Sequence, residues 1–191
     1  SIYSTNFLHK SRVSSVLTFM EKTVKLDRED IRNFVISSPE ILGVSLVKKL
    51  GPRHAAIAPY LRNENGSKVL TLPLAELCKG NDQQFCENFS LNKCSFDSFK
   101  RRFLKGGLTA ARQADVVVLS ALMDSGWDPS TDVDRYGRTV LMWAASHGTK
   151  PNGLRCVNLL MKAALQSGED IDTRASDGCT AFHYACEGGS L

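Results

Sequence analysis

Two segments of this chain repeat one pattern 41 residues apart, counted from Gly137 to Gly178. Residues 137–148 and 178–189 both follow G-x-T-x-φ-x-x-A-x-x-x-G, in which φ is an apolar residue. Such self-similarity is typical of repeat proteins, whose units stack on their neighbours and offer a long surface to a partner. The pattern therefore favours a binding protein over an enzyme.

Each position of the pattern has a structural reason. The first glycine suits a tight turn that requires a positive φ, and the threonine suits a helix N-cap. The apolar residue and the alanine three positions later share one face of a short helix, and we expect that face to be core. In the two copies these residues are Gly137, Thr139, Leu141 and Ala144, and Gly178, Thr180, Phe182 and Ala185.

The pattern resembles the ankyrin repeat, whose first helix opens with T-P-L-H-x-A. The second copy matches with its threonine, apolar residue, His183 and alanine, whereas the first copy has Met142 in place of the histidine. Residues 156–168 are similar to the second helix of such a repeat, and residues 116–129 to the end of an earlier one. The usual period is about 33 residues, so we place an insertion at 149–153.

The resemblance implies that the turn tips and the inner face of the first helix bind a protein. Tryptophan and tyrosine are also enriched among the residues that dominate binding energy at interfaces. The alternative is that Trp143 packs against the first half of the same chain. Because the pattern stops within a repeat, we expect further protein or another surface to cover its open end. The residues that the resemblance assigns to protein binding are Arg135, Tyr136, Arg138, Trp143, Asp177 and Tyr184.

The first half of the chain has a different organisation. Apolar residues recur at helical spacing from Val13 to Val24, Asp27 is a plausible N-cap for a second helix, and Pro39 should end that helix. A short turn and another helix, which reaches Leu61, follow. This series resembles one repeat of the mitochondrial transcription termination factor (mTERF) family, over roughly residues 7–90. Members of that family are helical-repeat proteins of mitochondria or plastids that bind DNA or RNA, and some serve organelle ribosomes.

Charge separates the two halves. Residues 1–107 contain 17 Lys and Arg against 10 Asp and Glu, a net charge of +7. Residues 108–191 contain 7 against 10, a net charge of −3. A basic half beside an acidic half suggests separate partners.

The densest basic run is residues 96–105, in which three phenylalanines share one helical face and the cations occupy the other. Contact with phosphates, contact with a membrane surface and a solvated face of a core helix all remain open for this run. Helix starts after the proline turn add backbone donors that favour phosphate. The predicted nucleic-acid contacts are Lys48, Lys49, Arg53, Lys100, Arg101, Arg102 and Lys105.

Catalysis and cofactors find no support in the sequence. The four histidines are scattered, and no phosphate-binding glycine loop, G-x-S-x-G or H-E-x-x-H motif occurs. None of the six cysteines forms C-x-x-C, so we expect reduced thiols and neither a metal nor a cofactor. No apolar run is long enough to span a membrane.

The sequence thus predicts an all-α helical-repeat solenoid, with an mTERF-like region over residues 1–107 and ankyrin-like repeats over 108–191. The expected function is that of a non-catalytic accessory protein, in a mitochondrion or plastid by resemblance and otherwise cytoplasmic. Its first half would contact RNA or DNA, and its second half a protein partner within a larger complex such as an organelle ribosome. The alternatives are a scaffold subunit that contacts only proteins and the regulatory arm of an enzyme.

Overall fold

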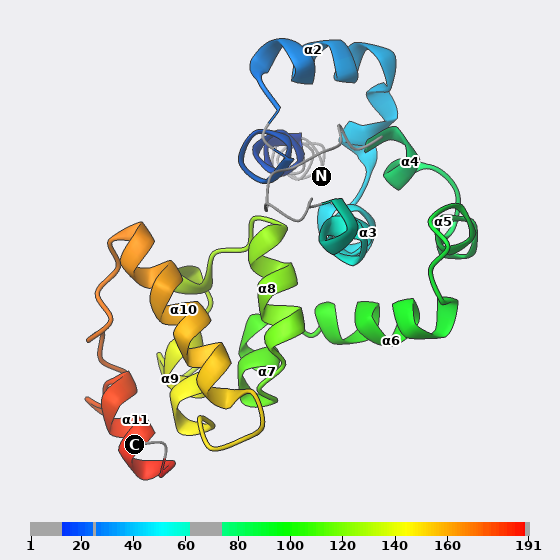
Figure 1. Ribbon diagram of the computed structural model, residues 1–191. Coiled ribbons are helices and arrows are strands. Elements are labelled where there is room, and N and C mark those ends of the chain that lie inside the picture. Colours follow the sequence, from blue (N-terminus) through cyan, green and yellow to red (C-terminus); the bar gives the residue numbers. More distant parts are fainter. Residues whose placement is uncertain (1–12, 25, 62–73, 190–191) are drawn as a thin grey trace, which may run out of the picture. The chain divides into compact units, whose positions relative to one another are not determined.

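The computed structural model describes residues 13–24, 26–61 and 74–189 (Figure 1). These residues are mostly helical, and their extended structure is limited to one isolated bridge between Val133 and Thr139. The expected all-α class is therefore confirmed. Within the described ranges, no helix combines the length and the apolarity that crossing a membrane requires. Residues 7–12 and 62–73 of the stretch that resembles mTERF lie outside the description.

The chain divides into two compact units, which we call unit 1 (Ser1–Lys100 with Asp124–Gly126) and unit 2 (Arg101–Met123 with Trp127–Leu191). The division falls near the predicted boundary at Gly107. The boundary comes before the helix Gly106–Arg112, and that helix belongs to unit 2 because it packs against another helix of unit 2, Val140–Ser146.

Unit 1 consists of short helical segments. In chain order they are a π-helix over Phe19–Val24, α2 over Arg28–Ser37, a 3-10 helix over Pro39–Gly43, a π-helix over Leu46–Leu50, α3 over Gly51–Ile57, a 3-10 helix over Ala58–Leu61, α4 over Leu74–Cys78, α5 over Asp82–Asn88 and α6 over Lys93–Phe103. The final residues of α6 belong to unit 2.

Local signals set the ends of these helices, as the sequence predicts. The Asp27 carboxylate accepts a hydrogen bond from the backbone N–H of Asp30 at 2.8 Å and caps α2. Helix α2 ends before Pro39, which opens the following 3-10 helix. The Ser45 hydroxyl caps the next segment.

The core of unit 1 is a single cluster of aliphatic and aromatic side chains. Phe96 belongs to it, and Phe99 packs against it. Phe103, further along α6, is buried as well. The apolar face of the basic run is therefore occupied inside the protein, which disfavours the membrane-surface alternative for this helix. The buried members of the cluster are Val16, Phe19, Met20, Ile41, Leu50, Ile57, Leu74, Leu77, Cys78, Phe85, Cys86 and Phe96.

Unit 2 contains the repeated pattern. Its elements are α7 (Gly106–Arg112), α8 (Val116–Asp124), a 3-10 helix (Pro129–Thr131), α9 (Val140–Ser146), α10 (Gly153–Ser167) and α11 (Ala181–Glu187). Helix α9 packs against α7, α10 and α11 (Figure 1).

Two glycines permit close approach between segments of unit 2. A Cβ on Gly107 would lie 1.9 Å from the Trp127 ring, and one on Gly188 would lie 2.4 Å from the Ser146 carbonyl oxygen.

The turn chemistry of both copies is as predicted. Gly137 and Gly178 have φ values of +70° and +80°. Thr139 accepts a hydrogen bond from the Met142 N–H at the start of α9, and Thr180 occupies the same position before α11.

The predicted core face is confirmed only for Ala144 in the first copy and is wrong in the second. Ala144 is 1% exposed, and Leu141 is half-buried. Phe182 is 62% exposed, and Ala185 is only half-buried. The reason is that α10 covers α9, whereas none of the described elements covers α11 in the same way.

Candidate protein-binding site

Asp134 organises the turn before α9. Its Oδ1 accepts hydrogen bonds from the backbone N–H groups of Tyr136 (2.8 Å) and Arg138 (3.0 Å), and its Oδ2 accepts from Arg138 Nε (2.8 Å) and Trp143 Nε1 (3.2 Å). Partial burial opposes ionisation of this carboxyl, but these hydrogen bonds outweigh it and lower its pKa. One carboxylate thus fixes both the turn and the indole ring of the following helix.

Arginines and aromatic rings alternate on this surface, and we call the set the arginine–aromatic ladder. The Arg135 guanidinium lies 4.6 Å from the Tyr136 ring centroid, and Arg138 lies 5.0 Å from the same ring. Arg138 is also 4.1 Å from the Trp143 ring, and Arg112, at the end of α7, is 4.5 Å from it. Each contact contributes on the order of 0.5–1 kcal/mol at an exposed site, and together they align three cations.

The ladder keeps unpaired positive charge. Arg138 forms an ion pair with Asp134 through Nε. Arg112 and Arg135 are exposed, and no carboxylate of the described residues forms an ion pair with either. Lys150 adds a fourth cation beside them, because its Nζ donates to the Arg112 carbonyl oxygen at 2.7 Å. A basic surface therefore lies within an otherwise acidic half of the chain.

The second copy of the pattern uses the same device with a different partner. Asp177 Oδ1 accepts from the Cys179 N–H (2.9 Å), and its Oδ2 accepts from the Tyr184 hydroxyl (2.6 Å). The bond from Tyr184 lowers the pKa of Asp177. Burial and this bond raise the pKa of Tyr184 to about 12. In both copies, then, an aspartate of the turn holds the aromatic residue of the helix that follows.

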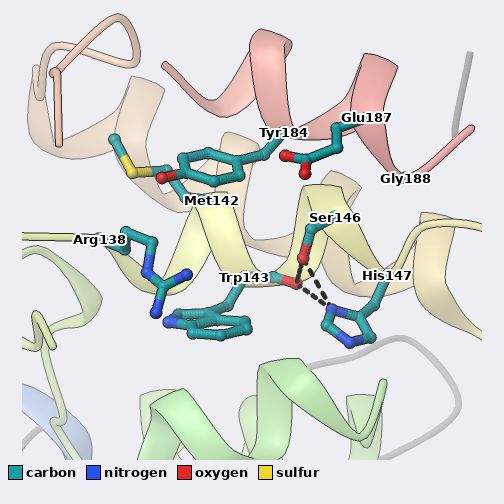
Figure 2. Close-up of a pocket in the computed structure, with 8 residues that line it drawn as sticks. All are labelled: Arg138, Met142, Trp143, Ser146, His147, Tyr184, Glu187 and Gly188. Atoms are coloured by element: carbon teal, nitrogen blue, oxygen red, sulfur yellow. Dashed lines mark hydrogen bonds between the residues drawn. The ribbon is translucent and has the colours of Figure 1, made fainter. Parts of the chain in front are cut away.

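A pocket of about 280 Å³ lies between α9 and α11, next to the ladder. Figure 2 shows Tyr184 and Glu187 on one side of it, and Trp143 and His147 on the other. This volume lies at the lower limit of the usual range for small-molecule and cofactor sites, about 300–1,000 Å³, and it suits one inserted side chain. The lining residues are Arg138, Met142, Trp143, Ser146, His147, Tyr184, Glu187 and Gly188.

Ser146 and His147 are the one part of the pocket with the composition of a catalytic pair. Ser146 Oγ lies 2.7 Å from His147 Nδ1. The same nitrogen lies 3.0 Å from the Trp143 carbonyl oxygen, which also accepts a hydrogen bond from Ser146 Oγ at 3.1 Å. Both side chains are thus bound to the backbone of α9.

The structure brings four of the predicted protein-binding residues together in the ladder: Arg135, Tyr136, Arg138 and Trp143. Tyr184 lines the adjacent pocket but is only 8% exposed, so it supports the site more than it presents a free ring. Asp177 holds that ring. Sequence reasoning missed Arg112, for which no local signal exists, and Asp134, which lies four residues before its partner Arg138 in the same turn.

Arg53, one of the predicted phosphate contacts, is buried within unit 1. Its side chain is 1% exposed, and its guanidinium donates to Asp82 Oδ1 (3.0 and 2.8 Å). It also donates to the carbonyl oxygens of Leu77 (2.9 Å), Lys79 (2.8 Å) and Gly80 (3.2 Å). Arg53 therefore ties α3 to the turn between α4 and α5.

Two further predicted cations serve the same turn. Lys49 Nζ donates to the Cys78 carbonyl oxygen at 2.6 Å, and Lys100 forms an ion pair with Asp82. Partial burial opposes ionisation of Asp82, but its bonds to Lys100 and Arg53 outweigh burial and lower its pKa. The predicted cations that stay on the surface are Lys48 in unit 1 and Arg101, Arg102 and Lys105 in unit 2. Arg102 forms an ion pair with Asp115.

All six cysteines are free thiols. Burial raises the pKa of both Cys78 and Cys156 to about 11, which makes these two thiols poor nucleophiles. Nowhere in the described ranges do three or more histidine, cysteine or acidic side chains gather as metal ligands would.

No protein-family model matches this chain, and no solved structure gives a significant match to it.

Proposed function

We propose that this chain is a non-catalytic binding protein, and that unit 2 holds a partner protein on the arginine–aromatic ladder. The observation that supports this most is the pair of unpaired guanidiniums, Arg112 and Arg135, next to the pocket of about 280 Å³. Guanidinium groups favour carboxylates, which they bind through two parallel hydrogen bonds. The partner segment is therefore acidic, with one apolar or aromatic side chain that enters the pocket beside Trp143.

Photo-cross-linking in the native cell tests this assignment and captures the partner whatever its identity. A photoreactive amino acid is placed at Val133, an exposed residue of the turn before α9, or at Glu187, which lines the pocket, and at Leu165, an exposed position on α10 away from the site. We expect one protein to be cross-linked from both flanking positions and not from Leu165. Different products from the two flanking positions would count against a single partner site.

Affinity for the identified partner then tests the chemistry. Arg112→Glu with Arg135→Glu reverses two charges of the ladder, and Arg155→Glu with Lys162→Glu makes the same change on exposed positions of α10. We expect the first pair to weaken binding by tenfold or more and to reduce its salt dependence, and the second to have little effect. Equal effects would mean that net charge, not the ladder, governs binding.

Nucleic-acid contact by the basic half is a second candidate, together with the organelle setting that the mTERF resemblance implies. The net charge of +7 on residues 1–107 supports it. Three of the seven predicted contacts are engaged within unit 1, so the protein-only scaffold gains weight from the structure. Salt-dependent RNA or DNA binding separates the two.

A further inference from the structure

A second hollow in unit 2 lies on another face of the α9–α11 pair and is almost entirely apolar. Its volume is about 320 Å³. We call it the α11 groove. Helix α9 contributes Leu141 and Ala145, helix α10 contributes Val157 and Met161, and the exposed Phe182 lies along α11. The remaining lining residues are Ile171, Asp172, Ala181 and Ala185.

Comparison of the two copies of the repeat shows that α11 is less covered than α9. At most positions of the pattern, α11 is more exposed than α9; the exception is Tyr184, which is buried where Trp143 is half-buried. Ala181 is half-buried where Val140 is fully buried, and Cys186 is exposed where Ala145 is buried. The apolar position of the pattern is half-buried as Leu141 and 62% exposed as Phe182. The two helices share their pattern, so the difference reflects what packs on each of them.

Helix α10 shows what kind of element covers such a face. It packs on α9 and buries Cys156, Leu160 and Ala164, which are spaced four residues apart and form one narrow stripe. It also carries the cations Arg155 and Lys162. The rim of the α11 groove is acidic, because Asp172 lines it and Glu169 and Asp170 precede it in the same turn.

We propose that the α11 groove binds an amphipathic helix of a partner protein. That helix has small or apolar residues at i, i+4 and i+8, as α10 does, and a lysine or arginine beside this stripe that faces Asp172. The mode is helix-in-groove recognition, in which apolar side chains at helical spacing give the affinity. The proposal does not depend on the arginine–aromatic ladder, whose residues come from α7, the turn before α9 and α9 itself, and none of which lines the groove.

The probe is a synthetic peptide of residues 153–167 with Cys156→Ala, acetylated and amidated and labelled with a fluorophore. It is titrated with the full chain and followed by fluorescence anisotropy. We expect saturable binding with a Kd below about 1 mM. The affinity should be modest, because an isolated helix of this length is marginal in water and the peptide must fold as it binds. The helical circular dichroism of the peptide should increase on binding.

Matched variants locate the binding. Phe182→Asp should weaken binding at least tenfold, and Leu165→Asp, which changes an equally exposed residue outside the groove, should not. If the melting curve shows that Phe182→Asp disturbs folding, Phe182→Ala takes its place, and it should give a milder loss of binding. A peptide with Leu160→Asp should not bind.

Three results of the peptide experiment would overturn the proposal. They are the absence of saturable binding, binding that survives Phe182→Asp, and binding of the Leu160→Asp peptide at equal strength. A fourth result is a protein that fails to bind the peptide but self-associates through Phe182, as measured by sedimentation equilibrium. That result would assign the groove to a second copy of the chain and would also overturn the proposal.

Discussion

Replacement of Arg53 by alanine should destabilise unit 1 more than any change at the surface cations. The side chain is 1% exposed, its guanidinium donates five hydrogen bonds, and it lies 5.0 Å from the Phe85 ring centroid. Without it, Asp82 keeps Lys100 as a partner, but the buried bond to the Leu77 carbonyl oxygen has no replacement.

The magnitude follows from these contacts. Removal of one partner from a buried ion pair costs about 3–5 kcal/mol, and an unsatisfied buried acceptor costs about 1–3 kcal/mol. Because Asp82 is partly exposed and keeps Lys100, we expect Arg53→Ala to lower the free energy of unfolding by about 3–4 kcal/mol. Arg53→Lys should give an intermediate loss, since an ammonium cannot reproduce the planar fork.

Urea denaturation followed by far-ultraviolet circular dichroism measures the effect. Lys48→Ala is the matched control, because Lys48 is an exposed cation near Arg53 in sequence and its loss should cost less than about 0.5 kcal/mol. Both tryptophans, Trp127 and Trp143, belong to unit 2, so their fluorescence identifies the transition of that unit. Identical denaturation midpoints for Arg53→Ala and Lys48→Ala would refute the reasoning.

Three further predictions concern a close-packed glycine, a paired aspartate and the surface cations. Gly107→Ala should lower the free energy of unfolding by about 1–3 kcal/mol, because its Cβ would overlap the Trp127 ring; Gly43→Ala, where the Cβ meets nothing within 4 Å, should have little effect in the same urea experiment. The lowered pKa of Asp82 should stabilise unit 1 above the ordinary aspartate pKa of 3.8, and that contribution should disappear as the pH falls through the lower folded-state value; acid titration of Asp82→Asn should show less of this loss. Charge reversal at Arg101, Arg102 and Lys105 should weaken RNA or DNA binding and flatten its dependence on salt, and wild-type protein that binds neither at low salt would remove the nucleic-acid candidate.

The sequence predicts features of this fold that depend on neighbours within a few residues. The cap at Asp27, the stop at Pro39 and the positive φ of Gly137 need only local chemistry. The functions of Arg53 and Lys100 were beyond such reasoning, because the partner of both, Asp82, lies 29 and 18 residues away.

The exposure of Phe182 could not be predicted either. Its pattern is that of a core position, but burial depends on whether another helix packs over it. The ladder was predictable in part. Tyr136, Arg138 and Trp143 are close in sequence, whereas Arg112 reaches the same ring from another helix.

The side chains of the arginine–aromatic ladder are ordered before any partner arrives. Arg138 and Trp143 are held by the same carboxylate, and Tyr136 lies between two guanidiniums. A free arginine side chain has about 2 kcal/mol of rotamer entropy to lose when it is immobilised. Much of that entropy has already been lost on folding, so a partner meets a rigid surface. The ordering of these arginine side chains then subtracts less from the binding free energy. Loosening the ladder by Asp134→Asn should therefore make the partner dissociate faster, although no atom that touches the partner has been changed.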